Sequence, residues 1–132
     1  MNTRALMAAS SLFMASVGLT ASFLPQEILT WLRAPSNPGL ALLVQLGGAL
    51  YIAFAMVNWT SRGSLIGGIY NRAVGMGNFT HFAIGAIALA KSLLAGQTAL
   101  WVWVGCAAYL VFAVCFGLVL FGSPVKPTPA AS

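Results

Sequence analysis

The sequence predicts an all-α membrane protein, a four-transmembrane-helix bundle with both termini on the same side of the bilayer. Three observations predict this class. Hydrophobic residues make up 60% of the 132 residues and charged residues only 5%, whereas a soluble domain carries about a quarter charged residues. The apolar residues gather into runs of about 20, which is the length of one bilayer crossing. Short polar stretches join these runs, and an even number of crossings returns the chain to its starting side.

The first predicted span covers residues 5–24, directly after Arg4. A basic start followed by an apolar run is also typical of a signal peptide. This run is longer than the usual apolar region of roughly 7–15 residues, and no clear small-residue cleavage site precedes Pro25. We therefore expect it to be retained as a membrane helix.

A polar link bounded by Pro25 and Pro38 follows the first span. Residues 26–32 have room for one or two turns of an interfacial helix, with Trp31 at the level of the lipid headgroups. The second predicted span covers residues 39–59, and a tight polar turn ends it.

The third apolar segment has no strong break between residues 65 and 96, which is too long for one crossing. We place the span at 72–92, because Arg72 and Lys91 can then extend their charged ends to opposite interfaces. The preceding residues 65–71 are expected to form an interfacial or re-entrant piece. Together with Arg72 at the start of the span, this piece provides the candidate interfacial residues, namely Gly67, Gly68, Tyr70, Asn71 and Arg72.

The fourth predicted span covers residues 98–121 and contains both cysteines, which we interpret as buried apolar side chains. Residues 123–132 are rich in Pro and polar side chains, and we expect a disordered cytoplasmic tail. The four spans together form a predicted membrane unit over residues 1–122.

The basic residues predict the orientation. If both termini share one side, that side holds four of the six cations, Arg4, Arg62, Arg72 and Lys126, and the other side holds Arg33 and Lys91. Cytoplasmic segments carry the excess of Lys and Arg, so both termini are expected in the cytoplasm. The cations stand singly, without the cluster that a nucleic acid requires.

Every predicted span has a row of small residues, which allow helices in lipid to approach closely. The rows are Ser11, Ala15, Gly18 and Ser22; Ala41, Gln45, Ala49 and Ala53; Gly77, His81 and Gly85 with Ala86 and Ala90; and Ala113 with Gly117. These rows predict a compact bundle.

Polar side chains within the spans are the candidates for function, because each is costly in lipid. His81 and Tyr51 are predicted near mid-membrane, with Asn78 and Ser11 about one turn toward the cytoplasm and Gln45 nearer the outer surface. The candidate polar cluster is thus Ser11, Gln45, Tyr51, Asn78 and His81. It either lines a pathway in which His81 exchanges protons, or it only joins helices by hydrogen bonds, which we favour.

No catalytic set, cofactor motif or metal site is predicted. Met56, Met76 and His81 are soft copper ligands in principle. However, Met76 and His81 are five residues apart and do not share a helix face well, so packing is the better interpretation.

Several segments resemble an uncharacterised family of small bacterial four-helix membrane proteins. They are QLGGALY from Gln45, the NW of Asn58 and Trp59, GGIYNR ending at Arg72, and GNFTHF from Gly77 to Phe82. The resemblance implies a bacterial inner-membrane location and no particular activity.

Three functional hypotheses remain open. The first is a non-enzymatic membrane protein that acts through helix contacts, as a homo-oligomer or as an accessory subunit of a membrane complex. The alternative is a small channel or transporter with a polar site at Asn78 and His81, since interrupted helices often line binding sites. The third is an enzyme with a lipid or quinone substrate held against Tyr70, Asn71 and Arg72. The expected partners are the lipid bilayer and another membrane-protein chain, and no nucleic acid.

Overall fold

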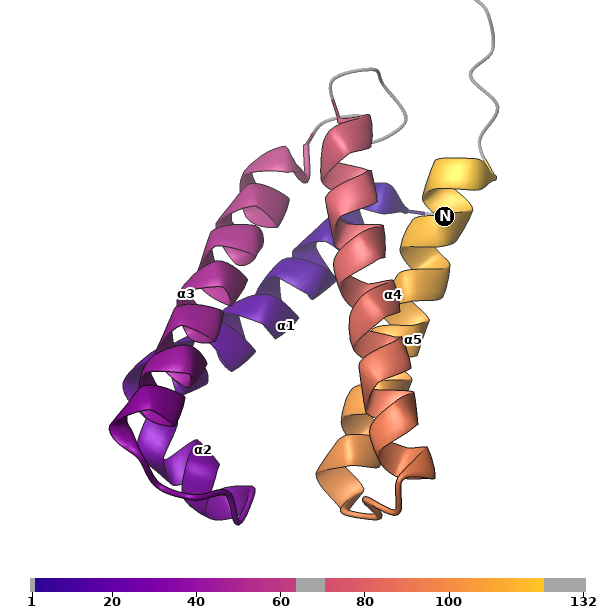
Figure 1. The fold of residues 1–132 in the computed structure, drawn as a ribbon. Coiled ribbons are helices and arrows are strands. Elements are labelled where there is room, and N and C mark those ends of the chain that lie inside the picture. Colours follow the sequence, from indigo (N-terminus) through magenta and orange to yellow (C-terminus); the bar gives the residue numbers. More distant parts are fainter. Residues whose placement is uncertain (1, 64–70, 123–132) are drawn as a thin grey trace, which may run out of the picture. The chain divides into compact units, whose positions relative to one another are not determined.

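The computed structural model describes residues 2–63 and 71–122, which divide into two compact units (Figure 1). The first unit contains α1 (Thr3–Phe23), α2 (Pro25–Trp31) and α3 (Pro38–Ser61). The second unit contains α4 (Arg72–Leu94) and α5 (Leu100–Phe121). All the described regular structure is helical, and each unit is a helical hairpin.

In the first hairpin, α1 and α3 run antiparallel and the short helix α2 lies at the turn between them (Figure 1). Asparagines define where both long helices begin. Asn2 Oδ1 accepts a hydrogen bond from the Ala5 N–H at 3.2 Å, and Asn37 Oδ1 accepts one from the Leu40 N–H at 2.7 Å. Pro38 occupies the first turn of α3, where its missing N–H has no helical partner to lose.

In the second hairpin, α4 ends at a glycine with left-handed backbone geometry. Gly96 has φ of 94°, its N–H donates to Leu93 O at 3.0 Å, and the Gln97 N–H donates to Ser92 O at 3.1 Å. These two bonds are those of a Schellman motif, which satisfies the last carbonyls of a helix. The motif ends α4 sharply and lets α5 start at Leu100, four residues after Gly96.

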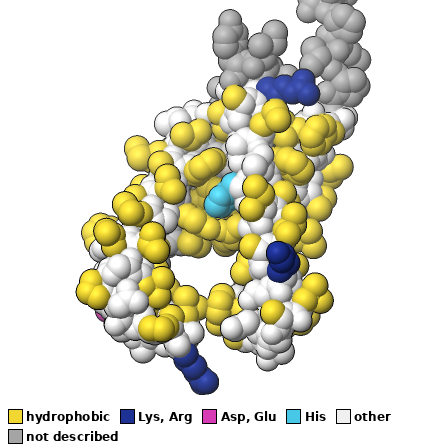
Figure 2. Space-filling model, in the orientation of Figure 1, with side chains coloured by type: hydrophobic (Ala, Val, Ile, Leu, Met, Phe, Trp, Pro, Cys, Tyr) yellow, Lys and Arg dark blue, Asp and Glu magenta, His cyan; other side chains and the backbone are white. Residues whose placement is uncertain are grey.

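The predicted fold class is confirmed. Four of the described helices, α1, α3, α4 and α5, are long and apolar enough to cross a membrane, so the chain is a multi-pass membrane protein. The helix expected over residues 26–32 is α2, and α4 begins at Arg72, where the third span was placed. Hydrophobic side chains are distributed over all the visible helices (Figure 2).

Other predictions lie outside the described residues or stay untested. Residues 65–70, with Gly67, Gly68 and Tyr70 of the interfacial segment, and the tail 123–132 are not described. Asn71 forms a turn, and Arg72 is exposed in the first turn of α4. The association of all four spans in one bundle and the side of the two termini stay predictions.

The packing face of α3 differs from the predicted row of small residues. Ala41, Gly48 and Ala55 are the buried apolar positions and recur every seven residues, whereas Ala49 and Ala53 are exposed. A four-residue step turns about 40° past a full rotation and accumulates, while a seven-residue step falls only about 20° short of two rotations. A helix that packs along its whole length therefore follows the seven-residue repeat.

Candidate functional site

The α1–α3 interface brings two backbones into direct contact. A Cβ placed on Gly48 would lie 2.7 Å from Ser22 N and 2.8 Å from Gly18 O, and one on Gly18 would lie 2.9 Å from Gly48 O. Such distances leave no room for a side chain on either residue. Two glycines, one from each helix, therefore permit the close approach that association in lipid requires.

Polar side chains bond the same two helices on either side of this contact. Ser11, buried on α1, donates to the Ala55 carbonyl of α3 at 2.7 Å. Toward the other end, Gln45 Nε2 donates to the Ser22 carbonyl at 3.3 Å. Two of the predicted polar residues thus join α1 to α3. The third on this hairpin, Tyr51, is half-buried on α3.

A further polar pair, outside the predicted cluster, joins α1 and α3 near the Ser61 end of α3. Asn58 is fully buried, and its Nδ2 donates to Ser10 Oγ at 3.0 Å and approaches Met14 Sδ at 3.7 Å. Ser10 in turn donates to Met7 O at 3.1 Å. The sequence contains a signal for this role of Asn58, because an amide within an apolar run needs a hydrogen-bond partner.

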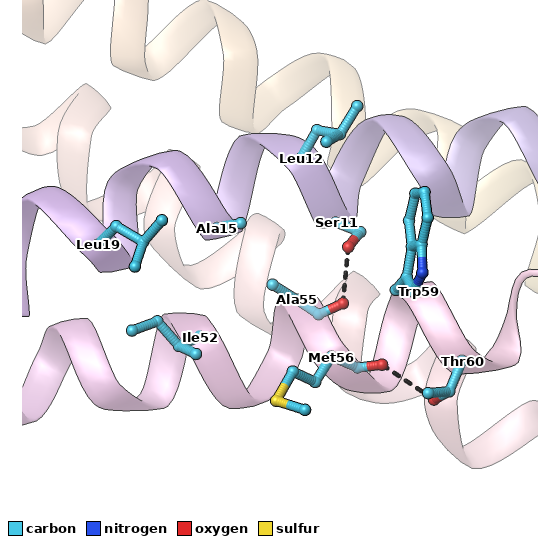
Figure 3. A pocket seen from close by; sticks show the side chains of 9 residues that line it. All are labelled: Ser11, Leu12, Ala15, Leu19, Ile52, Ala55, Met56, Trp59 and Thr60. Carbon is cyan, nitrogen blue, oxygen red and sulfur yellow. Dashed lines mark hydrogen bonds between the residues drawn. The ribbon is translucent and has the colours of Figure 1, made fainter.

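An apolar groove opens between α1 and α3 on the surface of this hairpin (Figure 3). Its volume is about 320 Å³. The lining residues come from both helices and are Ser11, Leu12, Ala15, Leu19, Ile52, Ala55, Met56, Trp59 and Thr60. In Figure 3, Leu19 lies at one end and the Trp59 indole at the other.

A cation stands at the Trp59 end of the groove. The Arg62 guanidinium carbon lies 3.7 Å from the centroid of the Trp59 ring. Its Nη1 also donates to the Trp59 carbonyl at 2.6 Å. A ring face and a carbonyl together hold the charge beside the groove, as expected for an Arg–Trp pair.

Aromatic rings fill the α4–α5 interface instead of backbone contacts. Phe82 of α4 is fully buried. Its ring is stacked with Phe112 at 4.7 Å and with Phe116 at 5.9 Å between centroids, and meets Tyr109 edge-on at 5.3 Å. Three rings of α5 therefore enclose one ring of α4.

Gly85 makes room for Tyr109, since a Cβ at Gly85 would clash with the tyrosine ring. The same ring lies 5.6 Å from the half-buried imidazole of His81 between centroids. Asn78, one turn earlier in α4, is fully buried, and its Nδ2 donates to the Val74 carbonyl of its own helix at 2.9 Å. Asn78 and His81 thus belong to the second hairpin, together with the aromatic cluster.

The predicted polar residues divide between the two hairpins. Ser11, Gln45 and Tyr51 belong to the first, and Asn78 and His81 to the second; their association in one cluster stays a prediction. Within residues 2–63 and 71–122, no three His, Cys, Asp or Glu side chains gather as a metal site would require. The sequence predicts neither the ring cluster around Phe82 nor the backbone contact at Gly48. Phenylalanine and glycine are both common in apolar runs, so neither residue is distinguished by its type.

Comparison of the chain with models of protein families, with curated proteins and with solved structures gave no match. The structure itself shows that the chain is a multi-pass membrane protein with four candidate spans.

Proposed function

We propose that the chain is a non-enzymatic membrane protein that acts through helix contacts, as a homo-oligomer or as an accessory subunit of a larger complex. The observation that carries this proposal is a row of small residues on α3 that the contact with α1 leaves exposed. Ala49 and Ala53 are one turn apart and exposed, outside the face that packs on α1. Small residues at this spacing allow another helix to approach closely in lipid.

The burial of the spans supports the same proposal. No more than 33% of the most apolar window of any of the four helices is buried. Much of the remaining surface is apolar, so lipid, the other hairpin or another membrane protein covers it. Ser10, Ser11 and Asn58 of the first hairpin, by contrast, already have hydrogen-bond partners within that hairpin.

The direct test is purification of the full-length protein in mild detergent at native expression level, with measurement of particle mass and of co-purifying proteins. A defined oligomer or a stoichiometric partner is expected. The double variant Ala49→Ile/Ala53→Ile should lose it, because the added bulk blocks close approach. The double variant Leu43→Ile/Leu50→Ile, which alters exposed α3 residues without adding volume, should retain it.

The alternative is a small channel or transporter with its polar site at Asn78 and His81. Its support is the full burial of an amide within an apolar helix, one turn from a histidine. A lone chain that moves a solute across liposome membranes, at a rate abolished by His81→Ala, would replace the first proposal with this one.

We also propose a bacterial inner-membrane location with both termini in the cytoplasm. The distribution of Lys and Arg and the resemblance to small bacterial membrane proteins support it. The test is a C-terminal fusion to a reporter enzyme that is active only outside the cytoplasm. Activity of this fusion in cells would contradict the proposed orientation.

A further inference from the structure

The groove between α1 and α3 combines an apolar interior with a cation at one end. We propose that it holds one acyl chain of an anionic phospholipid whose phosphate is bound by Arg62. This site is separate from the helix contacts proposed above, because its lining does not include Ala49 or Ala53.

The residues that line the groove favour an apolar ligand. Its two hydroxyl groups are already satisfied within the protein: Ser11 donates to Ala55 O at 2.7 Å, and Thr60 donates to Met56 O at 2.9 Å (Figure 3). The other lining side chains are hydrocarbon, thioether or indole. A polar ligand would lose its hydration here without gaining hydrogen bonds.

The dimensions fit one chain of one leaflet. The groove volume of about 320 Å³ is at the lower end of the range of small-molecule sites, roughly 300–1,000 Å³. Along α1 it runs from Ser11 to Leu19, which corresponds to about 12 Å of helix. This is shorter than one leaflet, about half of the ~30 Å hydrocarbon core.

The end of the groove at Trp59 is expected to lie at the level of the lipid headgroups. Tryptophan side chains concentrate at the membrane–water interface, and Arg62 caps α3 directly beyond it. The guanidinium has five N–H donors, and the Trp59 carbonyl engages one nitrogen. The planar fork of the remaining donors matches the oxygens of a phosphate.

Charge complementarity selects a lipid whose headgroup has a net negative charge, and not one whose phosphate is balanced by a cationic group. Glu27 is the sole acidic residue of the 132, and it lies in the first turn of α2, at the opposite end of the hairpin from Arg62. Arg4, in the first turn of α1, lies at the same end as Arg62. Two guanidinium groups thus share an end of the hairpin that has no acidic side chain, and phospholipid phosphates supply the missing charge.

The test is native mass spectrometry of the full-length protein with phosphatidylglycerol and phosphatidylcholine of identical acyl chains. The wild-type protein should retain one phosphatidylglycerol in preference to phosphatidylcholine. Arg62→Gln should reduce this preference about five-fold, the effect of one interfacial cation. Ala15→Phe should fill the groove and reduce retention of both lipids, while Lys91→Gln, which removes an exposed cation of α4, should change neither.

Glycerol phosphate, which has the anion but no acyl chain, should not displace the bound lipid. Equal retention of the two lipids, or an equal loss of preference in Lys91→Gln, would overturn the proposal. So would an Ala15→Phe variant that dissociates a dimer while it retains lipid, because a second copy of the chain would then be the occupant. Since Arg62 lies at a helix end, Arg62→Gln remains informative even if Ala15→Phe does not fold.

Discussion

In the α1–α3 hairpin the two backbones touch, whereas in the α4–α5 hairpin aromatic rings fill the space between the helices. Gly18 and Gly48 make the first contact, and Phe82 with its neighbours makes the second. The first interface also contains hydrogen bonds between side chains and the opposite helix. In the second, the side-chain amide of Asn78 bonds to its own helix, and a long thiol contact, from Cys106 Sγ to the Ala86 carbonyl at 3.9 Å, joins the two helices.

The difference shows two solutions to one physical problem. Lipid is as apolar as a leucine side chain, so burial of apolar surface does not drive helices together in a membrane. Where backbones approach closely, dispersion contacts and hydrogen bonds between the helices stabilise the pair. Where aromatic rings pack, the large ring surfaces in stacked or edge-on geometry stabilise it. The two interfaces should therefore respond differently to substitution.

The largest expected effect is on the backbone contact. Gly48→Ala should destabilise the protein by about 3 kcal/mol, because its methyl group meets backbone atoms that move only if the helices separate. The neighbouring Gly47 is the matched control, since a Cβ there has nothing within 4 Å. Gly47→Ala should be neutral or slightly stabilising. Equal losses for the two variants in an unfolding titration in detergent would show that helix propensity, and not contact, is being measured.

The second effect concerns the ring cluster. Phe82→Ala removes ring contacts with Phe112, Phe116 and Tyr109. Aromatic pairs contribute about 0.5–1.5 kcal/mol each, so the loss should be roughly 2 kcal/mol, in the lower part of the range for three pairs. Phe82→Leu should recover part of this loss by refilling the space. The same unfolding titration measures the stability of both variants. A Phe82→Ala variant as stable as the wild type would show that the ring cluster does not stabilise the α4–α5 hairpin.

The smallest effect concerns the buried polar pair. Asn58→Ala should cost about 0.6 kcal/mol, and no more than about 1.7, the range measured for hydrogen bonds between membrane helices. Ser10 keeps its bond to Met7 O, so no hydroxyl loses its last partner. Thr60→Ala is the control, because that hydroxyl bonds only within α3. A loss for Thr60→Ala as large as that for Asn58→Ala would argue against an interhelical role.

Much of the fold could be predicted from the sequence, because apolar composition and the residues that start or end helices determine each helix locally. Apolar runs, Pro25 and Pro38 defined the first three helices, and the cost of Arg72 in lipid defined the start of α4. The capping asparagines and Gly96 act within one turn of their own position. Such signals need no knowledge of distant neighbours.

The contacts between helices could not be predicted in the same way. The rule that small residues line interfaces identified Ala41 correctly but extended the row to Ala49 and Ala53, since many rows of small residues exist on one helix. Gly48 was distinguished only by facing Gly18, which depends on the register of the hairpin. Asn58 and Ser10 are likewise paired by that register, across 48 residues of sequence.

Forced unfolding of single full-length molecules in a bilayer tests the comparison most directly. Gly48→Ala should lower the force that releases residues 2–63 more than Phe82→Ala does, and Phe82→Ala should have the larger effect on the release of residues 71–122. Equal effects of the two variants on both segments would contradict the assignment of each contact to its own hairpin.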